Sequence, residues 1–192
     1  LRHNLDWPTV DDYWRKEAKR IIDRYIKIKP NIVKKIDDFY NDNLKGESLK
    51  IAVHLRGGRG AKELYHKDNV NLEYYKNCIK KYLSDNNIKD YVIFAASDTN
   101  EAISFMEDSF ENVKSYSCHR TDDYYMNGKP YNKVQEVGWN ESQNQFMPDK
   151  RAEIGEEALI ESQLLSKCDV MFHHDSLLAV SANFVNNKLP TK

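Results

Sequence analysis

The sequence predicts an α/β domain with a doubly wound, mostly parallel sheet, preceded by an amino-terminal helical segment. Short and almost continuously apolar segments alternate with longer amphipathic segments of helical periodicity. Apolar runs of this kind are typical of parallel strands that are buried on both faces, and the alternation is typical of strand–helix–strand units. The chain has 192 residues, which suffices for one such domain with a substantial core.

The amino-terminal part of the chain is predicted to be helical. Apolar and aromatic residues recur at helical spacing between Val10 and Ile26. Pro30 suits the first turn of a second helix, whose apolar positions reach Leu44. We therefore expect residues 1–48 to form a helical lead-in and residues 49–192 to form a Rossmann-like domain.

Strands and helices are expected to alternate through the rest of the chain. The apolar segments predict strands at 50–55, 91–96, 113–116 and 169–173. The amphipathic segments predict helices from residue 72 to about 86 and at 99–110, 155–166 and 177–186.

Residues 117–153 interrupt this alternation with a long, polar and aromatic segment. It contains Tyr124, Tyr125 and Trp139. A connection of this length inside a compact domain is typical of a functional insertion or of a mobile segment. Aromatic side chains suit the recognition of sugars or peptides, although the 12 tyrosines of the chain can also reflect an AT-rich genome.

Charge and cysteine content exclude several classes of protein. The 29 basic and 30 acidic residues leave a formal charge of −1, which argues against binding of nucleic acid through bulk charge. The three cysteines form no C-x-x-C pair, so neither a zinc site nor a disulfide scaffold is expected. No segment is typical of a signal peptide or membrane span. The unpaired cysteines favour the cytoplasm, whereas the sequon at Asn140 would fit the Golgi lumen if a targeting segment is missing.

Polar side chains follow three of the predicted strands at the point where each strand ends. Arg56 follows the first strand, Asp98 the second, and Asp175 and Ser176 follow the last. Because the carboxyl ends of parallel strands meet at one edge of a sheet, these residues are expected to lie together. An arginine fork and a helix amino terminus both suit phosphate oxygens, so the pattern points to a nucleotide diphosphate.

Each of these residues also has a purely structural explanation. Arg56 can be a partner in a surface ion pair, and Asp98 can cap the helix that follows it. Asp175 or Ser176 can cap the last helix in the same way. Only the joint placement of these residues therefore points to a site.

Histidines and glycines near the strand ends do not define a metal site or a known phosphate loop. His54 suits a hydrogen-bonded position in the core. His173 and His174 are adjacent in an extended segment and point to opposite faces, so one metal ion would not take both. The glycines that include Gly57 and Gly58 match neither the P-loop nor the dinucleotide fingerprint. No metal is expected.

Three segments, in order, resemble the motifs of the fucosyltransferase superfamily that includes the α1,6-, α1,2- and protein O-fucosyltransferases. The stretch Val53-His54-Leu55-Arg56 looks like its H-x-R motif, and residues 91–98 are similar to its second motif, a strand that ends in Ser-Asp. Residues 160–176 resemble the third motif, which leads through a strand into a serine-bearing loop and helix. The resemblance runs from about residue 30 to 187.

The resemblance implies that the chain is the carboxyl-terminal, donor-binding half of a GT-B glycosyltransferase. Such an enzyme transfers fucose from GDP-fucose to a sugar hydroxyl with inversion, and it needs no metal or other cofactor. The implied partners are therefore a nucleotide-sugar donor and a glycan acceptor.

The resemblance also implies roles for individual residues. Arg56 would bind the β-phosphate and neutralise charge as GDP leaves. The other donor-binding residues would be His54, Gly57, Gly58, Asp98, Glu161, Asp175 and Ser176, with Asp98 at the guanosine and Ser176 at the phosphate. The catalytic base would be Glu63, with His66 and Asp68 as rivals, and Tyr124, Tyr125 and Trp139 would bind the acceptor.

The chain departs from the family pattern just after the arginine. Many relatives carry an acidic residue two or three positions after it, where this chain has Gly58 and Arg59. Two alternatives therefore stay open. One is a glycosyltransferase that uses another nucleotide sugar, and the other is a non-catalytic domain that binds glycan or protein through its aromatic segment.

Overall fold

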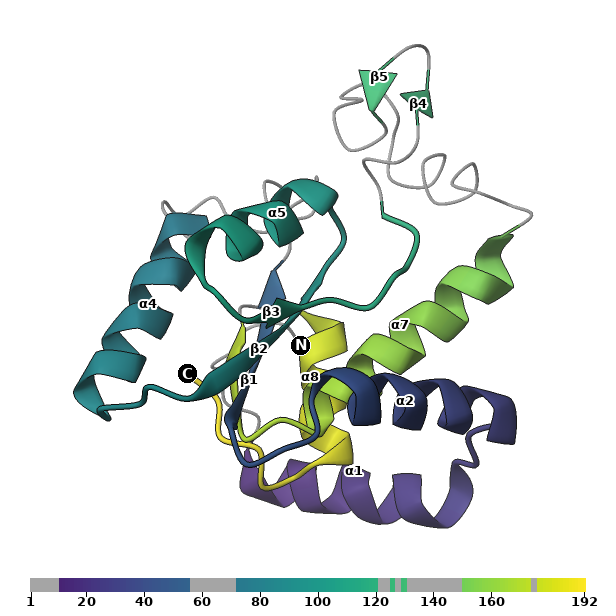
Figure 1. The fold of residues 1–192 in the computed structure, drawn as a ribbon. Helices are drawn as coiled ribbons and strands as arrows, with labels where there is room; N and C mark the ends of the chain where they lie inside the picture. The colour runs from purple at the N-terminus through teal and green to yellow at the C-terminus, as the bar shows by residue number, and fades with distance from the viewer. Residues whose placement is uncertain (1–10, 56–71, 121–124, 127–128, 131–149, 174–175) are drawn as a thin grey trace.

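A four-stranded parallel sheet forms the centre of the computed structural model, which describes residues 11–55, 72–120, 125–126, 129–130, 150–173 and 176–192 (Figure 1). The strand order is β3-β2-β1-β6. Its members are β1 (Leu49–Leu55), β2 (Tyr91–Ser97), β3 (Val113–Lys114) and β6 (Val170–His173). A separate antiparallel pair joins β4 (Tyr125–Met126) to β5 (Lys129–Pro130). The predicted doubly wound, parallel α/β class is confirmed.

Helices cover both faces of the sheet (Figure 1). The described helices are α1 (Asp12–Tyr25), α2 (Pro30–Asn43), α4 (Leu72–Asp85), α5 (Asn100–Ser109), α7 (Arg151–Ser166) and α8 (Leu177–Val185). One core cluster joins the sheet to α4 and α5, and a second joins it to α2, α7 and α8. Parallel strands require this double cover because both of their faces are apolar.

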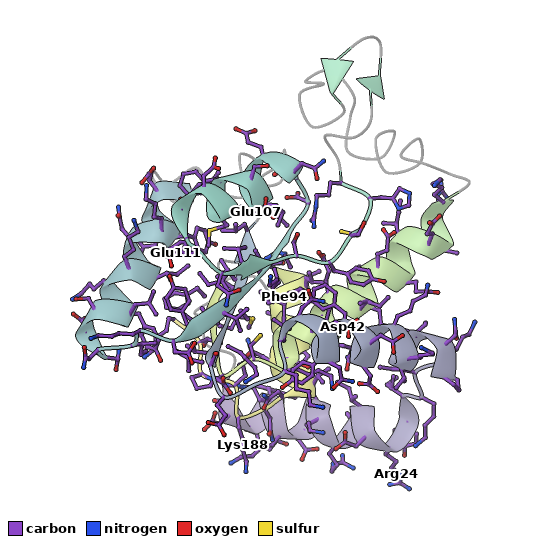
Figure 2. The ribbon with its side chains drawn as sticks, viewed as in Figure 1. Arg24, Asp42, Phe94, Glu107, Glu111 and Lys188 are labelled. Carbon is purple, nitrogen blue, oxygen red and sulfur yellow. The ribbon has the colours of Figure 1, made fainter. Side chains whose placement is uncertain are left out.

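Successive residues of the central strands supply the two cores in turn. Ile51 and Val53 pack toward α4 and α5, whereas Ala52 between them packs toward α2 and α7. In β2, Phe94 is fully buried on the α2 side. Figure 2 shows Phe94 in the interior, while Arg24 lies at the periphery.

Most predicted element boundaries agree with the structure, and two need correction. Pro30 occupies the first turn of α2, as expected. Helix α7 begins at Arg151 rather than at Gly155, and β3 ends at Lys114 rather than at residue 116. Thr99, not Asp98, caps α5, because its side chain accepts a hydrogen bond from the Ala102 N–H.

The first two helices relate differently to the rest of the molecule. Helix α2 contributes Ile32 and Ile36 to the core that also contains Phe94. Helix α1 has no buried residue, and its Trp14 and Tyr25 side chains are 59% and 63% exposed. The proposed division at residue 48 stays a prediction. Within the described residues, no helix has both the length and the apolarity needed to cross a membrane.

Candidate functional site

The carboxyl ends of the central strands are aligned across the sheet. His54 of β1 lies in register with Ala96 of β2 and with His173 of β6. One position further, Leu55 pairs with Ser97. The predicted convergence of strand ends on one edge is therefore present in the described strands.

A cavity of about 200 Å³ opens at this edge. Three residues singled out from the sequence meet there, namely His54 from β1, Asp98 after β2 and Glu161 from α7. The remaining lining residues come from the segment after β3 and from α7, β2 and α8: Ser97, Cys118, His119, Ile154, Glu157, Ala158 and Leu178. The cavity is referred to below as the edge pocket.

Glu161 contributes a buried carboxyl group to the edge pocket. Its side chain is only 8% exposed. Burial raises the pKa of Glu161 to about 7, and the negative charges of Glu157 and Asp98 act in the same direction. The guanidinium of Arg120 opposes the rise in this pKa. The Cys118 thiol donates a hydrogen bond of 3.4 Å to the carboxylate, and burial raises the pKa of this thiol to about 12. The thiol therefore stays protonated as a donor near neutral pH.

Arg120 connects three separate parts of the molecule beneath the edge pocket. Its buried guanidinium donates to the Ser97 carbonyl at the end of β2 and to the Tyr116 carbonyl at 3.0 Å. The same group lies 3.6 Å from a carboxylate oxygen of Glu161 on α7. Arg120 thereby fixes the end of β2 relative to α7 and compensates the charge of a buried carboxylate.

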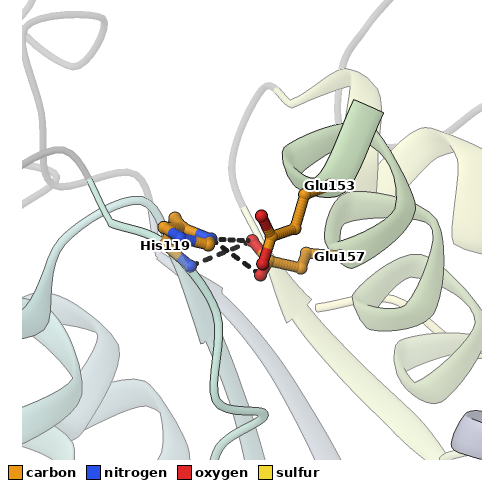
Figure 3. Close-up of side chains that lie close together, drawn as sticks. All are labelled: His119, Glu153 and Glu157. Atoms are coloured by element: carbon orange, nitrogen blue, oxygen red, sulfur yellow. Dashed lines mark hydrogen bonds and ion pairs between the residues drawn. The ribbon is translucent and has the colours of Figure 1, made fainter. Parts of the chain in front are cut away.

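His119 faces α7 at the rim of the edge pocket (Figure 3). Its backbone N–H donates to Glu157 at 2.9 Å, and its Nδ1 lies 2.8 Å from a Glu157 oxygen. Glu153 lies one helical turn from Glu157, on the same side of α7 (Figure 3). Three glutamates spaced by four residues, at 153, 157 and 161, thus point toward the segment after β3.

Arg120 and His119 are functional candidates that the sequence reasoning missed. Both lie in a segment without helical or strand periodicity, so no pattern separates them from surface residues. The spacing of Glu153, Glu157 and Glu161 could have indicated this region, because i,i+4 spacing places all three carboxylates on one face of a helix. Such an acidic face predicts basic partners, although it does not say which residues they are.

The other predicted site residues divide into two groups. Ser176 is buried and caps α8, since its hydroxyl accepts from the Leu178 N–H, so the capping explanation holds for this residue. Outside the described residues lie Arg56, Gly57, Gly58, Glu63, Tyr124, Trp139 and Asp175, together with the rivals His66 and Asp68; the side chain of Tyr125 is not described either. Their roles stay predictions.

Solved fucosyltransferase structures share this fold. NodZ α-1,6-fucosyltransferase co-crystallised with GDP matches with a TM-score of 0.61 at 20% sequence identity, over 91% of this chain and 47% of that chain. Fucosyltransferase NodZ from Bradyrhizobium matches with a TM-score of 0.60 at 20% identity, over the same shares. POFUT1 in complex with GDP-fucose matches with a TM-score of 0.54 at 12% identity, over 95% of this chain and 49% of that chain.

These comparisons establish the fold of the chain. The chain spans about half the length of the fucosyltransferases that it matches, so its fold is that of one half of such a protein. No protein-family model matches the sequence, and no curated protein does so.

We predict that Glu161→Gln stabilises the protein at high pH. The raised pKa means that the folded chain keeps a proton that the unfolded chain releases. Stability from this group is therefore fully present below about pH 4.5 and is lost as the pH rises through about 7. Because glutamine stays neutral, the variant should gain about 3 kcal/mol at pH 8 and nothing at pH 4. Urea unfolding at both pH values measures this. A matched Glu156→Gln variant, on the same helix, should show little difference, and a pH-independent effect of Glu161→Gln would contradict the prediction.

We also predict that Arg120→Met destabilises the fold by about 3–5 kcal/mol, because it leaves a buried carboxylate and two carbonyl groups without their cation. Adding Glu161→Gln to this variant should recover part of the loss. The measurement is a double-mutant cycle on the free energy of unfolding at pH 8. Strictly additive effects of the two substitutions would show that Arg120 and Glu161 do not interact.

Proposed function

We propose that this chain is the donor-binding half of a glycosyltransferase that transfers fucose from GDP-fucose to a sugar hydroxyl, with inversion and without a metal ion in the transfer step. One observation carries the proposal. The edge pocket combines His54, Asp98 and Glu161 at the carboxyl edge of a parallel sheet, in a fold shared with fucosyltransferases crystallised with GDP or GDP-fucose.

Glu161 is suited to recognise guanine. The edge of this base that pairs with cytosine presents two N–H donors side by side, and an ionised carboxylate is an acceptor with two oxygens. Adenine presents an unprotonated ring nitrogen at the same position. This nitrogen is an acceptor, so it cannot form a hydrogen bond with the carboxylate. The Cys118 thiol and the Arg120 guanidinium hold the Glu161 carboxylate in place, so the acceptor geometry is set before a nucleotide binds.

Asp98 and Ser176 are proposed to contact the rest of the nucleotide. Asp98 is half-buried and lines the edge pocket, and its carboxylate is suited to accept hydrogen bonds from the ribose or base. Ser176 lies at the amino terminus of α8, where backbone N–H groups favour an anion. We place the diphosphate there, together with Asp175.

The transfer step requires charge neutralisation at the leaving group. In the proposed step the acceptor oxygen attacks C1 of fucose while the bond from C1 to the GDP oxygen breaks. Arg56, with the backbone of Gly57 and Gly58 beside it, takes up the charge that develops on the β-phosphate. Glu63 accepts the proton of the acceptor hydroxyl.

The acceptor is proposed to be a glycan held by aromatic side chains of the long insertion. Tyr124, Tyr125 and Trp139 are the residues proposed for this contact, because aromatic rings pack against the apolar faces of sugars. Since the chain spans about half of the fucosyltransferases that it matches, we assign transfer to a protein that contains a second half.

We predict that GDP binds more tightly than ADP or UDP and that its affinity falls below pH 7. Only ionised Glu161 accepts both guanine N–H groups, and at pH 6 about one tenth of this residue is ionised. Calorimetric titration at pH 8 and pH 6 should show a roughly 10-fold weakening. The Glu161→Gln variant should bind GDP weakly at both pH values. Any pH dependence that remains in this variant reports the titration of GDP itself and can be subtracted. Preference for UDP or ADP would point to another nucleotide-sugar donor, and absence of nucleotide binding would favour a non-catalytic domain.

We predict that Arg56→Ala lowers kcat by about 10²–10³-fold in the intact enzyme, since it removes the cation that faces the leaving group. Arg56→Lys should restore little activity, because an ammonium cannot form the two parallel hydrogen bonds of a guanidinium. The measurement is release of GDP from GDP-fucose in the presence of a glycan acceptor. Turnover of Arg56→Ala at the rate of the unmodified enzyme would exclude this role.

A further inference from the structure

A cluster of potential metal ligands lies at the rim of the edge pocket. His119, Glu153 and Glu157 each offer a ligand atom, and these atoms lie within 4.8 Å of one another (Figure 3). The imidazole comes from the segment after β3, whereas the two carboxylates project from successive turns of α7. The cluster therefore combines nitrogen and oxygen ligands from two elements that the fold holds side by side.

Hydrogen bonds orient the imidazole of His119. The Lys150 ammonium lies 2.9 Å from Nε2, and an ammonium group can only donate, so Nε2 is the accepting nitrogen. Nδ1 then carries the proton and donates it to Glu157 at 2.8 Å. In metal sites, a carboxylate that accepts from one ring nitrogen commonly orients a histidine whose other nitrogen binds the ion. His119 and Glu157 have this arrangement.

A cation already occupies the position between the two remaining ligands. Besides its contact with Nε2, the Lys150 ammonium lies 3.6 Å from a carboxylate oxygen of Glu153. The Lys150 ammonium thus lies where a metal ion would contact both groups. Further along α7, Glu161 adds to the acidic character of this region.

We propose that this cluster binds one divalent transition-metal ion of the zinc class in place of the Lys150 ammonium. His119 Nε2 and the Glu153 carboxylate are the protein ligands, Glu157 orients the imidazole, and water completes the coordination. Imidazole nitrogen and carboxylate oxygen are both normal zinc ligands, whereas magnesium prefers oxygen alone.

The position of the cluster in the chain gives the ion a structural role. His119 precedes residues 121–149, and Glu153 follows them. An ion held by both would join the two ends of this segment. His119 and Glu157 also line the edge pocket, but this structural role does not require the fucosyl transfer proposed above.

Calorimetric titration of the chain with zinc chloride tests the proposal. One zinc ion per chain should bind, and His119→Ala should abolish this binding. Glu157→Gln should weaken it about 10–100-fold through loss of the orienting hydrogen bond. Glu153→Gln should weaken it too, and because this side chain is 56% exposed the substitution leaves the fold intact. Lys150→Met should tighten binding, since it removes the competing ammonium, and magnesium chloride should show no binding at the same concentration.

The matched control is Glu156→Gln, which lies next to Glu157 on α7 but pairs with Lys35 outside the cluster. It should bind zinc like the unmodified chain. Absence of zinc binding would refute the proposal, and so would equal affinity in the unmodified chain and in folded Glu153→Gln and His119→Ala. GDP titration of the same samples reports separately on the proposed function.

Discussion

The fold depends on the burial of β1 between two parallel neighbours. Strand β1 pairs with β2 on one side and with β6 on the other, and its residues from Lys50 to Leu55 are buried. Two parallel strands must be joined by a crossover connection, which usually contains a helix. The helices of these crossovers cover both apolar faces of the sheet. The carboxyl ends of the strands are therefore collected at one edge, and the edge pocket exists because of this arrangement.

Polar partners balance the three glutamates at this edge within the described residues. The Arg120 guanidinium lies beside the buried carboxylate of Glu161, the His119 imidazole beside Glu157 and the Lys150 ammonium beside Glu153. The three glutamates lie on one face of α7, so the edge pocket and the proposed metal cluster occupy successive turns of the same helix. A change in the charge of one group is thus felt by its neighbours on adjacent turns.

Sequence periodicity was informative where burial alone decides the structure. The apolar runs of β1 and β2 and the proline at the start of α2 led to correct elements, and three predicted donor residues meet in one pocket. The early start of α7 was missed because the polar turn before Gly155 carries no apolar stripe. Arg120 was missed because its partners Ser97 and Glu161 are brought to it only by tertiary packing, which periodicity does not encode.

The contact between His119 and Lys150 has a consequence for how such a protein changes over evolution. It joins the two ends of residues 121–149 through described side chains. The entropic free-energy cost of closing a segment between fixed ends grows only slowly with its length, by about 0.6 kcal/mol for each doubling. Insertions and deletions in this segment therefore cost the domain little stability. The segment can change in length while the packing of the sheet and of the edge pocket stays unchanged.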